Sequence, residues 1–298
     1  MTKIDILTDR SAWQPAYEDR RADQRTAVGF PAAAVSRLRE QERERIADWT
    51  VAALTTTSGD HAGFVAVGTR EEEGTLIGLI GDLWIAPEHL GAGHDLAARD
   101  WAENFCREAG ATRIGVKLPG ESELFADYEL RAQNRIRALT SPVASTDFTC
   151  RSLTADEYPQ WLATEQEGYI SDILRAGGVT EAQARAKSDA DFAMLLPEGL
   201  QTPNNSILVL EDEGRPVGSG WLRHDHLPGV TYGYGIRVAP EYRGHGFGRA
   251  GMAAGEAATL AAGDTALTFT VWEGNTVAMN LYTAAGYQVA SEYRSKLL

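Results

Sequence analysis

The chain contains two similar halves, and this internal repeat limits the folds open to it more than any other feature. Each half begins with a short strand-like segment and a helical region that carries a tryptophan, Trp13 in the first half and Trp161 in the second. Each half continues with a strand pair, an Ala-Pro dipeptide (86–87 and 239–240), a glycine-rich turn and a closing strand-like run. A period of about 150 residues is too long for a solenoid, so the repeat indicates a duplicated domain.

The segment between the halves predicts where one domain ends and the next begins. Residues 140–147 are small and polar and include Pro142, a composition typical of a linker. We therefore expect one domain at 1–139 and another at 148–298. The full length of 298 residues suits two domains of the usual size.

Composition and charge argue against several classes of protein. The formal net charge of −14, without a Lys/Arg cluster, makes a nucleic-acid partner unfavourable. The apolar runs are too short to cross a membrane, and residues 1–10 lack the pattern of a signal peptide. Cys106 and Cys150 fall in no CxxC or CxxH pattern, and no His/Asp/Glu cluster has the spacing of metal ligands. We expect a cytoplasmic protein that has no metal site and accepts a neutral or cationic partner.

Apolar periodicity predicts an α+β fold for the second half. Strands are expected at 207–210, 216–223, 230–238 and 266–272. An alanine-rich helix that ends at Gly263 precedes the last of these strands, and a helix at 276–285 follows it before a final strand. This order predicts a mixed, mostly antiparallel sheet flanked by helices, with one parallel strand after the alanine-rich helix.

A glycine-rich turn joins the strand at 230–238 to the alanine-rich helix. Because Gly244, Gly246 and Gly248 have no Cβ atoms, backbone N–H groups can point into one concavity, and the helix adds its free N-terminal amides. Arg243 and Arg249 flank the turn with positive charge. The turn therefore predicts a pyrophosphate site. It is not a P-loop, since GxxxxGK[ST] is absent, and no acidic residue completes a Rossmann fingerprint.

A second motif lies further along the chain, where residues 275–287 read NTVAMNLYTAAGY. Together with R-x-x-G-x-G at 243–248, the frame N-x-x-A-x-x-L-Y-x-x-x-G-Y resembles the GNAT superfamily, the GCN5-related N-acetyltransferases. The resemblance covers 148–298 well and 1–139 in outline, and the two-repeat layout is similar to that of the mycothiol synthases. It implies two GNAT-like α+β domains and the use of acetyl-CoA as co-substrate.

The resemblance also implies roles for individual residues. The amides of 244–249 would hold the CoA pyrophosphate, while Ile236 and Val238, on a strand that splays from its neighbour, would pair with the pantetheine arm and the acetyl carbonyl. Asn275 would bond the pantetheine chain, and Tyr282 would be the general acid that protonates the departing thiolate. The implied cofactor-binding residues are Ile236, Val238, Arg243, Gly244, His245, Gly246, Phe247, Gly248, Arg249, Asn275 and Ala278.

Plainer interpretations of these residues stay open. Asn275 can cap the helix that follows it, Tyr282 can be a core residue of an amphipathic helix, and His245 can be a solvent-facing turn residue. The strand at 230–238 also lacks the Glu or Asp that many relatives use as general base. Candidates for a base elsewhere are Glu165, Glu167, Asp225 and His226.

The first half departs from the motif at the positions that matter for chemistry. Leu90 replaces the arginine before the turn, and Asp95 replaces the third glycine, where a carboxylate would repel a phosphate. Residues 124–125 read Leu-Phe about where 281–282 read Leu-Tyr, so the phenol is missing. We therefore expect the first half to be a degenerate, non-catalytic GNAT-like domain. A structural role is favoured, while shaping the acceptor cleft, forming a homodimer and holding a ligand non-productively stay open.

The leading hypothesis is an acetyl-CoA-dependent N-acetyltransferase that acts on a small-molecule amine. A non-catalytic acyl-CoA-binding or sensing protein is an alternative, favoured by the missing strand carboxylate and the degenerate first half. An acetyltransferase for protein amines is another, because an acidic chain can accept a cationic partner. The acceptor and the acyl-chain length stay open.

Overall fold

The compact units of the protein do not coincide with the two halves of its sequence. A computed structural model describes residues 2–72, 74–140, 148–176 and 179–298. The first unit contains Met1–Ala138, Leu227–Gly229 and Thr268–Leu298, and the second contains Leu139–His226 and Val230–Leu267. Apart from Thr140, the predicted linker lies outside the described residues. The predicted boundaries follow the repeat in the sequence. The packing differs from them, because it assigns Thr268–Leu298, the end of the second half, to the first unit.

Strand β12 (Gln288–Leu297) explains why the units cross the halves. It lies between β5 (Arg113–Leu118) and β6 (Glu129–Ala138) and is antiparallel to both. Tyr293, for example, is opposite Lys117 on one side and Ala132 on the other. Because β12 satisfies backbone donors and acceptors of two strands from the first half, it completes their sheet.

The order of the elements repeats along the chain, as a duplication predicts. The first half contains β1 (Lys3–Ile6), α1 (Trp13–Ala27), α2 (Ala32–Arg45), β2 (Thr50–Thr55), β3 (His61–Glu72), β4 (Thr75–Ile85), the 3₁₀ turn η1 (Pro87–His89), α3 (His94–Glu108), β5, the 3₁₀ turn η2 (Glu123–Phe125) and β6. The second half contains β7 (Thr149–Ser152), α4 (Tyr158–Ala176), α5 (Glu181–Leu195), η3 (Gly199–Gln201), β8 (Asn205–Asp212), β9 (Arg215–Leu227), β10 (Val230–Val238), η4 (Pro240–Tyr242), α6 (Phe247–Ala261), β11 (Ala266–Trp272), α7 (Thr276–Ala284) and β12. The first half thus has the short turn η2 where the second half has helix α7.

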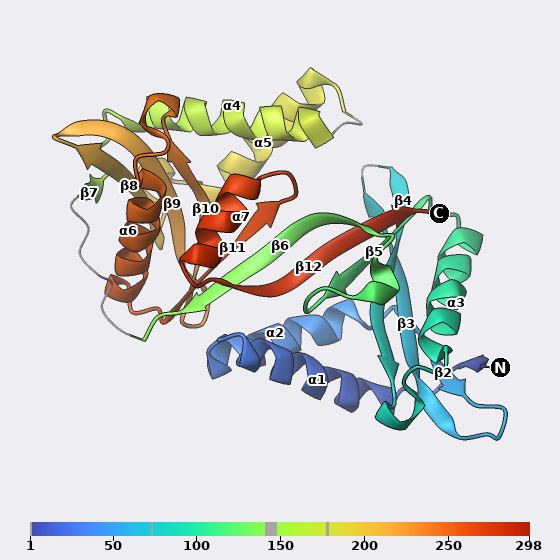
Figure 1. The fold of residues 1–298 in the computed structure, drawn as a ribbon. Coiled ribbons are helices and arrows are strands. Elements are labelled where there is room, and N and C mark those ends of the chain that lie inside the picture. Colours follow the sequence, from blue (N-terminus) through green and yellow to red (C-terminus); the bar gives the residue numbers. More distant parts are fainter. Residues whose placement is uncertain (1, 73, 141–147, 177–178) are drawn as a thin grey trace. The chain divides into compact units, whose positions relative to one another are not determined.

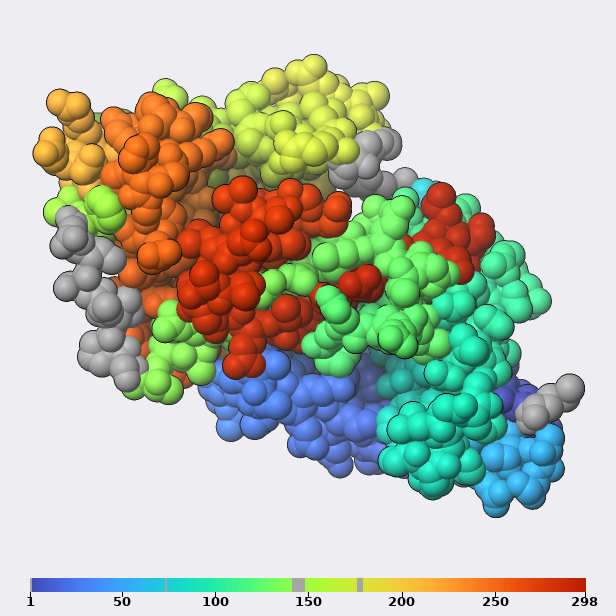
Figure 2. All heavy atoms as spheres, in the orientation of Figure 1, coloured from blue at the N-terminus to red at the C-terminus, as the bar shows by residue number. Residues whose placement is uncertain are grey.

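The sheet of the first unit is mixed and mostly antiparallel, which confirms the predicted α+β class. Its strand order is β1-β2-β3-β4-β5-β12-β6, and β11 follows β6. Of the printed pairings in this unit, β4 with β5 is parallel and the others are antiparallel. Helices α1 and α2 cover one face of the sheet and α3 covers the other (Figure 1). Figure 2 shows α1 and α2 in blue and α3 in teal at the surface, so each presents an outer side to solvent.

The two faces of this sheet carry different side chains. Ile114, Val116 and Leu118 of β5 belong to a core that includes Ala102 and Cys106 of α3. The alternation of a strand therefore directs Gly115 and Lys117 toward the opposite face, which α1 and α2 cover. On that face Trp13 and Tyr17 of α1 pack with Trp49, Val51 and Phe64.

The second unit contains β10, β9, β8 and β7 in that order, with β7, β8 and β9 antiparallel. Trp161 of α4 and Phe192 of α5 pack on Trp221 of β9, with ring centroids 5.7 and 5.6 Å from its ring. Phe247 of α6 packs on Leu210 and Val217, in a separate cluster. One cluster thus fixes α4 and α5, and the other fixes the beginning of α6.

We expect Gly81→Ala to destabilise the first unit, because a Cβ at this position would overlap the ring of Trp49. Overpacking of this kind lowers the free energy of unfolding by about 1–3 kcal/mol. Denaturant unfolding followed by tryptophan fluorescence would measure the change. Gly120→Ala is the matched control, since a Cβ there meets no atom within 4 Å. Equal midpoints for the two variants would contradict the packing described here.

Candidate functional site

The glycine-rich turn of the second half has a backbone that only glycine adopts easily. Gly244 and Gly246 have φ angles of +83° and +91°, and Gly246 is the N-cap residue of α6. A Cβ at either position would meet no atom within 4 Å, so the left-handed conformation, and not crowding, explains these glycines. Gly248 lies one residue into α6 and does not have a positive φ, so its lack of a side chain serves another purpose. A glycine at this position leaves the first amides of the helix accessible to a ligand.

The side chains around this turn divide into an anchor and an exposed group. Phe247 is 4% exposed and packs against Phe148, with ring centroids 4.4 Å apart. Arg243, His245 and Arg249 are exposed. Arg243 folds back, and its Nε donates to the carbonyl oxygen of Val238 at 3.2 Å. The turn is therefore anchored at Phe247 and presents positive charge and free amides to solvent.

The equivalent turn of the first half has the same backbone and different side chains. Gly91 and Gly93 have φ angles of +75° and +82°, and Gly93 is the N-cap residue of α3. Leu90 is 67% exposed where the second half has an arginine, and Asp95 occupies the first turn of α3. The carboxylate of Asp95 is thus placed at the amide end of a helix, where it competes with a bound anion.

Strand β10 changes the face of its side chains shortly before the turn. Tyr234 packs on the α4–α5 side, where its ring is 4.3 Å from that of Trp221. Gly235 faces the same side, because a Cβ there would lie 3.8 Å from Oε2 of Glu165 in α4. Ile236 faces α6, where it lies against Gly251. Two consecutive residues on one side of a strand indicate a β-bulge.

The first half has an irregularity at the matching place. The register between β3 and β4 shifts where Ala66 is opposite Asp82 and Val67 is opposite Ile80. Beyond this point β4 also leaves β5, since their pairing covers only Ile77–Ile80 with Arg113–Val116 although β4 extends to Ile85. Strands β4 and β5 of the first half therefore splay apart. The splay predicted for the strand at 230–238 in the second half stays a prediction.

Each bulge has an ion pair, and the two pairs are reversed. Asp82 and Gly235 each lie three residues before the end of their strands, β4 and β10. In the first half the strand supplies the acid, and Nη2 of Arg20 in α1 lies 2.6 Å from Oδ2 of Asp82. In the second half the strand supplies the cation, and Nε of Arg237 donates to Oε1 of Glu165 at 3.0 Å. A carboxylate therefore lies at the bulge in both halves, from the strand in one and from the helix in the other.

Glu165 differs from the other candidates for a general base. Its side chain is 18% exposed, and Arg237 engages Oε1, which leaves Oε2 over Gly235. Beside the pair is an open hollow lined by Arg237 and by Gln160, Ala163, Thr164, Glu167 and Gly168 of α4. The carboxylate of Glu165 is thus held at the strand position where the sequence lacks one.

The remaining base candidates lie in other surroundings. Glu167 is 62% exposed and pairs with Arg185 at 2.7 Å. Asp225 has a φ of +49°, and its backbone N–H donates to Asp264. His226 stacks on Tyr232 with ring centroids 5.0 Å apart, and burial lowers the pKa of its imidazole.

Helix α7, in the first unit, positions Asn275, Ala278 and Tyr282. Oδ1 of Asn275 accepts from the backbone N–H of Ala278 at 3.2 Å, so the capping role of Asn275 is present and uses only one end of its amide. Tyr282 is 8% exposed and packs against Phe269, with ring centroids 4.3 Å apart. Burial raises the pKa of its phenol, which keeps the hydroxyl protonated at neutral pH.

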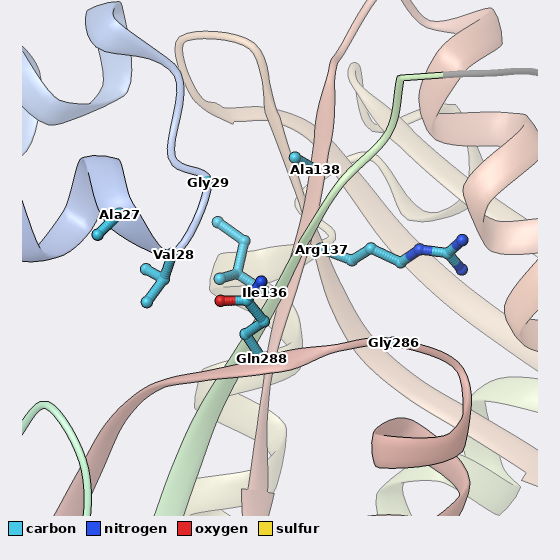
Figure 3. A pocket seen from close by; sticks show the side chains of 8 residues that line it. All are labelled: Ala27, Val28, Gly29, Ile136, Arg137, Ala138, Gly286 and Gln288. Carbon is cyan, nitrogen blue, oxygen red and sulfur yellow. The ribbon is translucent and has the colours of Figure 1, made fainter.

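One recess of the first unit contains none of the predicted site residues. It is lined by Ala27, Val28, Gly29, Ile136, Arg137, Ala138, Gly286 and Gln288 (Figure 3). The side chain of Arg137 extends away from Ala27 and Val28 in this view. Across the described ranges, no group of three or more His, Cys, Asp or Glu side chains could hold a metal ion. None of the helices described is long and apolar enough to cross a membrane.

Comparison with known proteins adds the family. Residues 160–287 match the sequence model of the acetyltransferase (GNAT) family. The chain carries a GNAT-family acetyltransferase domain. The match identifies the second half as an acyltransferase domain of this family and confirms the resemblance found in the two motifs.

Relatives of this GNAT domain are known from Bacillus subtilis. YycN and YdgE, both described as uncharacterized N-acetyltransferases, are 28% and 24% identical to it over 149 residues, which are 49% and 48% of this chain and 96% and 94% of theirs. A GCN5-related N-acetyltransferase from Sphaerobacter thermophilus is similar in structure over 99% of this chain and 95% of its own, with a TM-score of 0.58 and 16% identity. The GNAT fold therefore extends over both halves.

Sequence patterns did not reveal the partner of Glu165 in the GNAT domain. Arg237 lies between Ile236 and Val238, which were expected to contact the cofactor, and no role was assigned to it. Gly168, one helical turn after Glu165, makes room for the Arg237 guanidinium. The glycine in α4 and the arginine in β10 are the sequence signal that could have revealed this contact.

We expect Asn275→Ala to destabilise helix α7 by about 0.5–2 kcal/mol, because the cap on the Ala278 amide is lost. Asn275→Asp keeps an acceptor oxygen at this position and is expected to retain most of the stability. Thermal unfolding of the two variants beside the wild type measures the difference. If Asn275→Ala were as stable as Asn275→Asp, the cap would contribute nothing.

Proposed function

We propose that the protein is an acetyl-CoA-dependent N-acetyltransferase that transfers an acetyl group to the amine of a small molecule. The observation that carries the proposal is the contrast between the two turns. Both have the same left-handed glycines, but only the second has an accessible helix N-terminus flanked by Arg243 and Arg249. Asp95 marks the first turn as unsuited to a pyrophosphate. The cofactor is therefore assigned to the turn at 243–249.

The transfer needs one proton acceptor and one proton donor. The amine attacks the thioester carbonyl, so a C–N bond forms while the C–S bond breaks, and the nitrogen loses a proton while the sulfur gains one. Tyr282 suits the donor role because burial keeps its phenol protonated. Glu165 suits the acceptor role because Oε2 lies over Gly235, where the strand has no carboxylate of its own. Backbone N–H groups of the splayed strand would stabilise the oxyanion.

The charge of the chain supports an amine as acceptor. An acidic surface attracts the protonated form of an amine and raises its local concentration. The hollow beside Arg237 and Glu165 is a candidate position for such a molecule, and Glu165 gives it an anionic side.

A non-catalytic acyl-CoA-binding protein is the second candidate. The strand at 230–238 favours it, since that strand carries no carboxylate that could accept a proton from the amine. The first half, with η2 in place of α7 and Asp95 in its turn, is assigned a non-catalytic role under either proposal.

Calorimetric titration with CoA and acetyl-CoA tests the cofactor site. We expect one site per chain, with binding weakened at least ~100-fold by Gly246→Glu, which fills the turn with an anionic side chain. Asp95→Gly is the matched control in the first half and is expected to leave binding unchanged. Thiol release with a library of amines would then show turnover, which Tyr282→Phe is expected to slow by about 100-fold. Two sites per chain would refute the assignment of the first half, and no binding would refute the proposal as a whole.

Glu165→Gln tests the proton acceptor. We expect kcat to fall about 100- to 10,000-fold while the affinity for acetyl-CoA stays within twofold, because the amide keeps the hydrogen bond from Arg237 and cannot accept a proton. Asp172→Asn, on the same helix and 60% exposed, is the control that should retain full activity, because Asp172 does not line the hollow. An unchanged kcat in Glu165→Gln would assign the proton transfer to another group.

A further inference from the structure

Three arginines of the first unit converge on one buried carboxylate. Glu42 of α2 is 3% exposed. Nη2 of Arg25 lies 2.6 Å from Oε2, and Nη2 of Arg45 lies 2.9 Å from Oε1. Nε of Arg21 lies 3.8 Å from Oε1, and the hydroxyl of Tyr17 donates to the same oxygen at 2.6 Å. A single negative charge is thus shared by three guanidinium groups.

A fourth cation faces this cluster from the sheet. Lys117 of β5 points to the face that α1 and α2 cover, as the alternation of β5 requires. Burial, together with the charges of Arg21, Arg45 and Arg25, lowers the pKa of its amine to about 8. The side chain nevertheless remains exposed to solvent.

Two other carboxylates on this face pair with other arginines. Glu18 pairs with Arg39 and Arg43 at 2.9 and 2.7 Å. Asp82 pairs with Arg20 at 2.6 Å. Arg21, Arg25 and Arg45 thus have Glu42 as a common partner, in a chain whose formal net charge is −14.

One hydrogen-bond donor in this cluster is unused. The side chain of Arg21 is 16% exposed, and its Nη1 donates to Gln24 at 3.1 Å. Its Nε is buried and makes no hydrogen bond with the described residues. A buried donor without a partner is unfavourable, and so is an excess of like charge, unless an anion compensates both.

We propose that Arg21, Arg45 and Lys117 form a binding site for a small anion with a carboxylate or phosphate group, in the first half of the chain. The limited exposure of the Arg21 side chain restricts the ligand to a small group. Guanidinium groups bind carboxylate and phosphate oxygens in the same planar geometry, so both chemistries fit. The first half, whose own glycine-rich turn is unsuited to a pyrophosphate, would thus bind a different anion at this site.

Calorimetry with sodium phosphate and sodium malonate, at constant ionic strength in a zwitterionic buffer, tests the site. We expect saturable binding of at least one anion, with a dissociation constant on the order of 1 mM. Lys117→Met should weaken it at least ~10-fold, as loss of a charge-assisted contact does. Arg45→Gln, which alters a 56% exposed side chain, should have a similar effect without threatening the fold.

Two controls make the outcome specific to this site. Lys187→Met removes an exposed lysine that pairs with Asp191 at 3.2 Å in the second unit, and should leave anion binding unchanged. Gly246→Glu removes any anion binding at the proposed cofactor turn, so the binding that Lys117→Met weakens should persist in this variant. Absence of saturable heat with both anions, or equal affinity in Lys117→Met and wild type, would overturn the proposal.

Discussion

The pairing of β12 with two strands at once is the constraint on which the first unit depends. Residues 288–297 supply the backbone partners of both β5 and β6, so the strands of the first half form a continuous sheet only when the end of the second half is in place. Helix α7 precedes β12 directly, and its attachment to this sheet holds Asn275 and Tyr282 in the first unit. The proposed catalytic phenol therefore depends on a strand pairing between halves that the repeat alone does not suggest.

The two halves share a backbone and differ in the side chains that the proposed chemistry needs. Both turns retain left-handed glycines, because the change of direction from strand to helix requires them whatever the side chains do. Side chains that would contact a ligand differ between the two turns. Asp95 stands where the second half has Gly248, and Leu90 stands where it has Arg243. At the bulge of the first half the carboxylate belongs to a strand residue, Asp82, and its arginine partner to a helix. At the bulge of the second half the carboxylate belongs to a helix residue, Glu165, and its arginine partner to a strand. Geometry is retained more strictly than residue identity in this chain.

Local patterns predicted the elements of the second half closely. The alternation of 266–272 matches β11, and the segment 230–238 matches β10, since both signals lie within a few neighbouring residues. The partner of β12 was not predictable, because strand pairing over such a distance is decided by the whole sheet. The bulge and the contact of Glu165 with Arg237 depend on how α4 lies over β10, which periodicity does not encode. For the site, the cap at Asn275 agrees with one of the interpretations that the sequence left open, and the roles in catalysis remain predictions.

The place of β12 also sets an order of events during synthesis. Strands β5 and β6 leave the ribosome long before residues 288–297 exist, so the first half emerges with two strand edges whose partner has not been made. Unpaired edges attract other strands, and a direct pairing of β5 with β6 is the nearest substitute. The nascent chain must then either keep these edges apart or open a temporary pairing to admit β12. Completion of the first unit is thus a late folding step, although most of its residues are synthesised before those of the second unit.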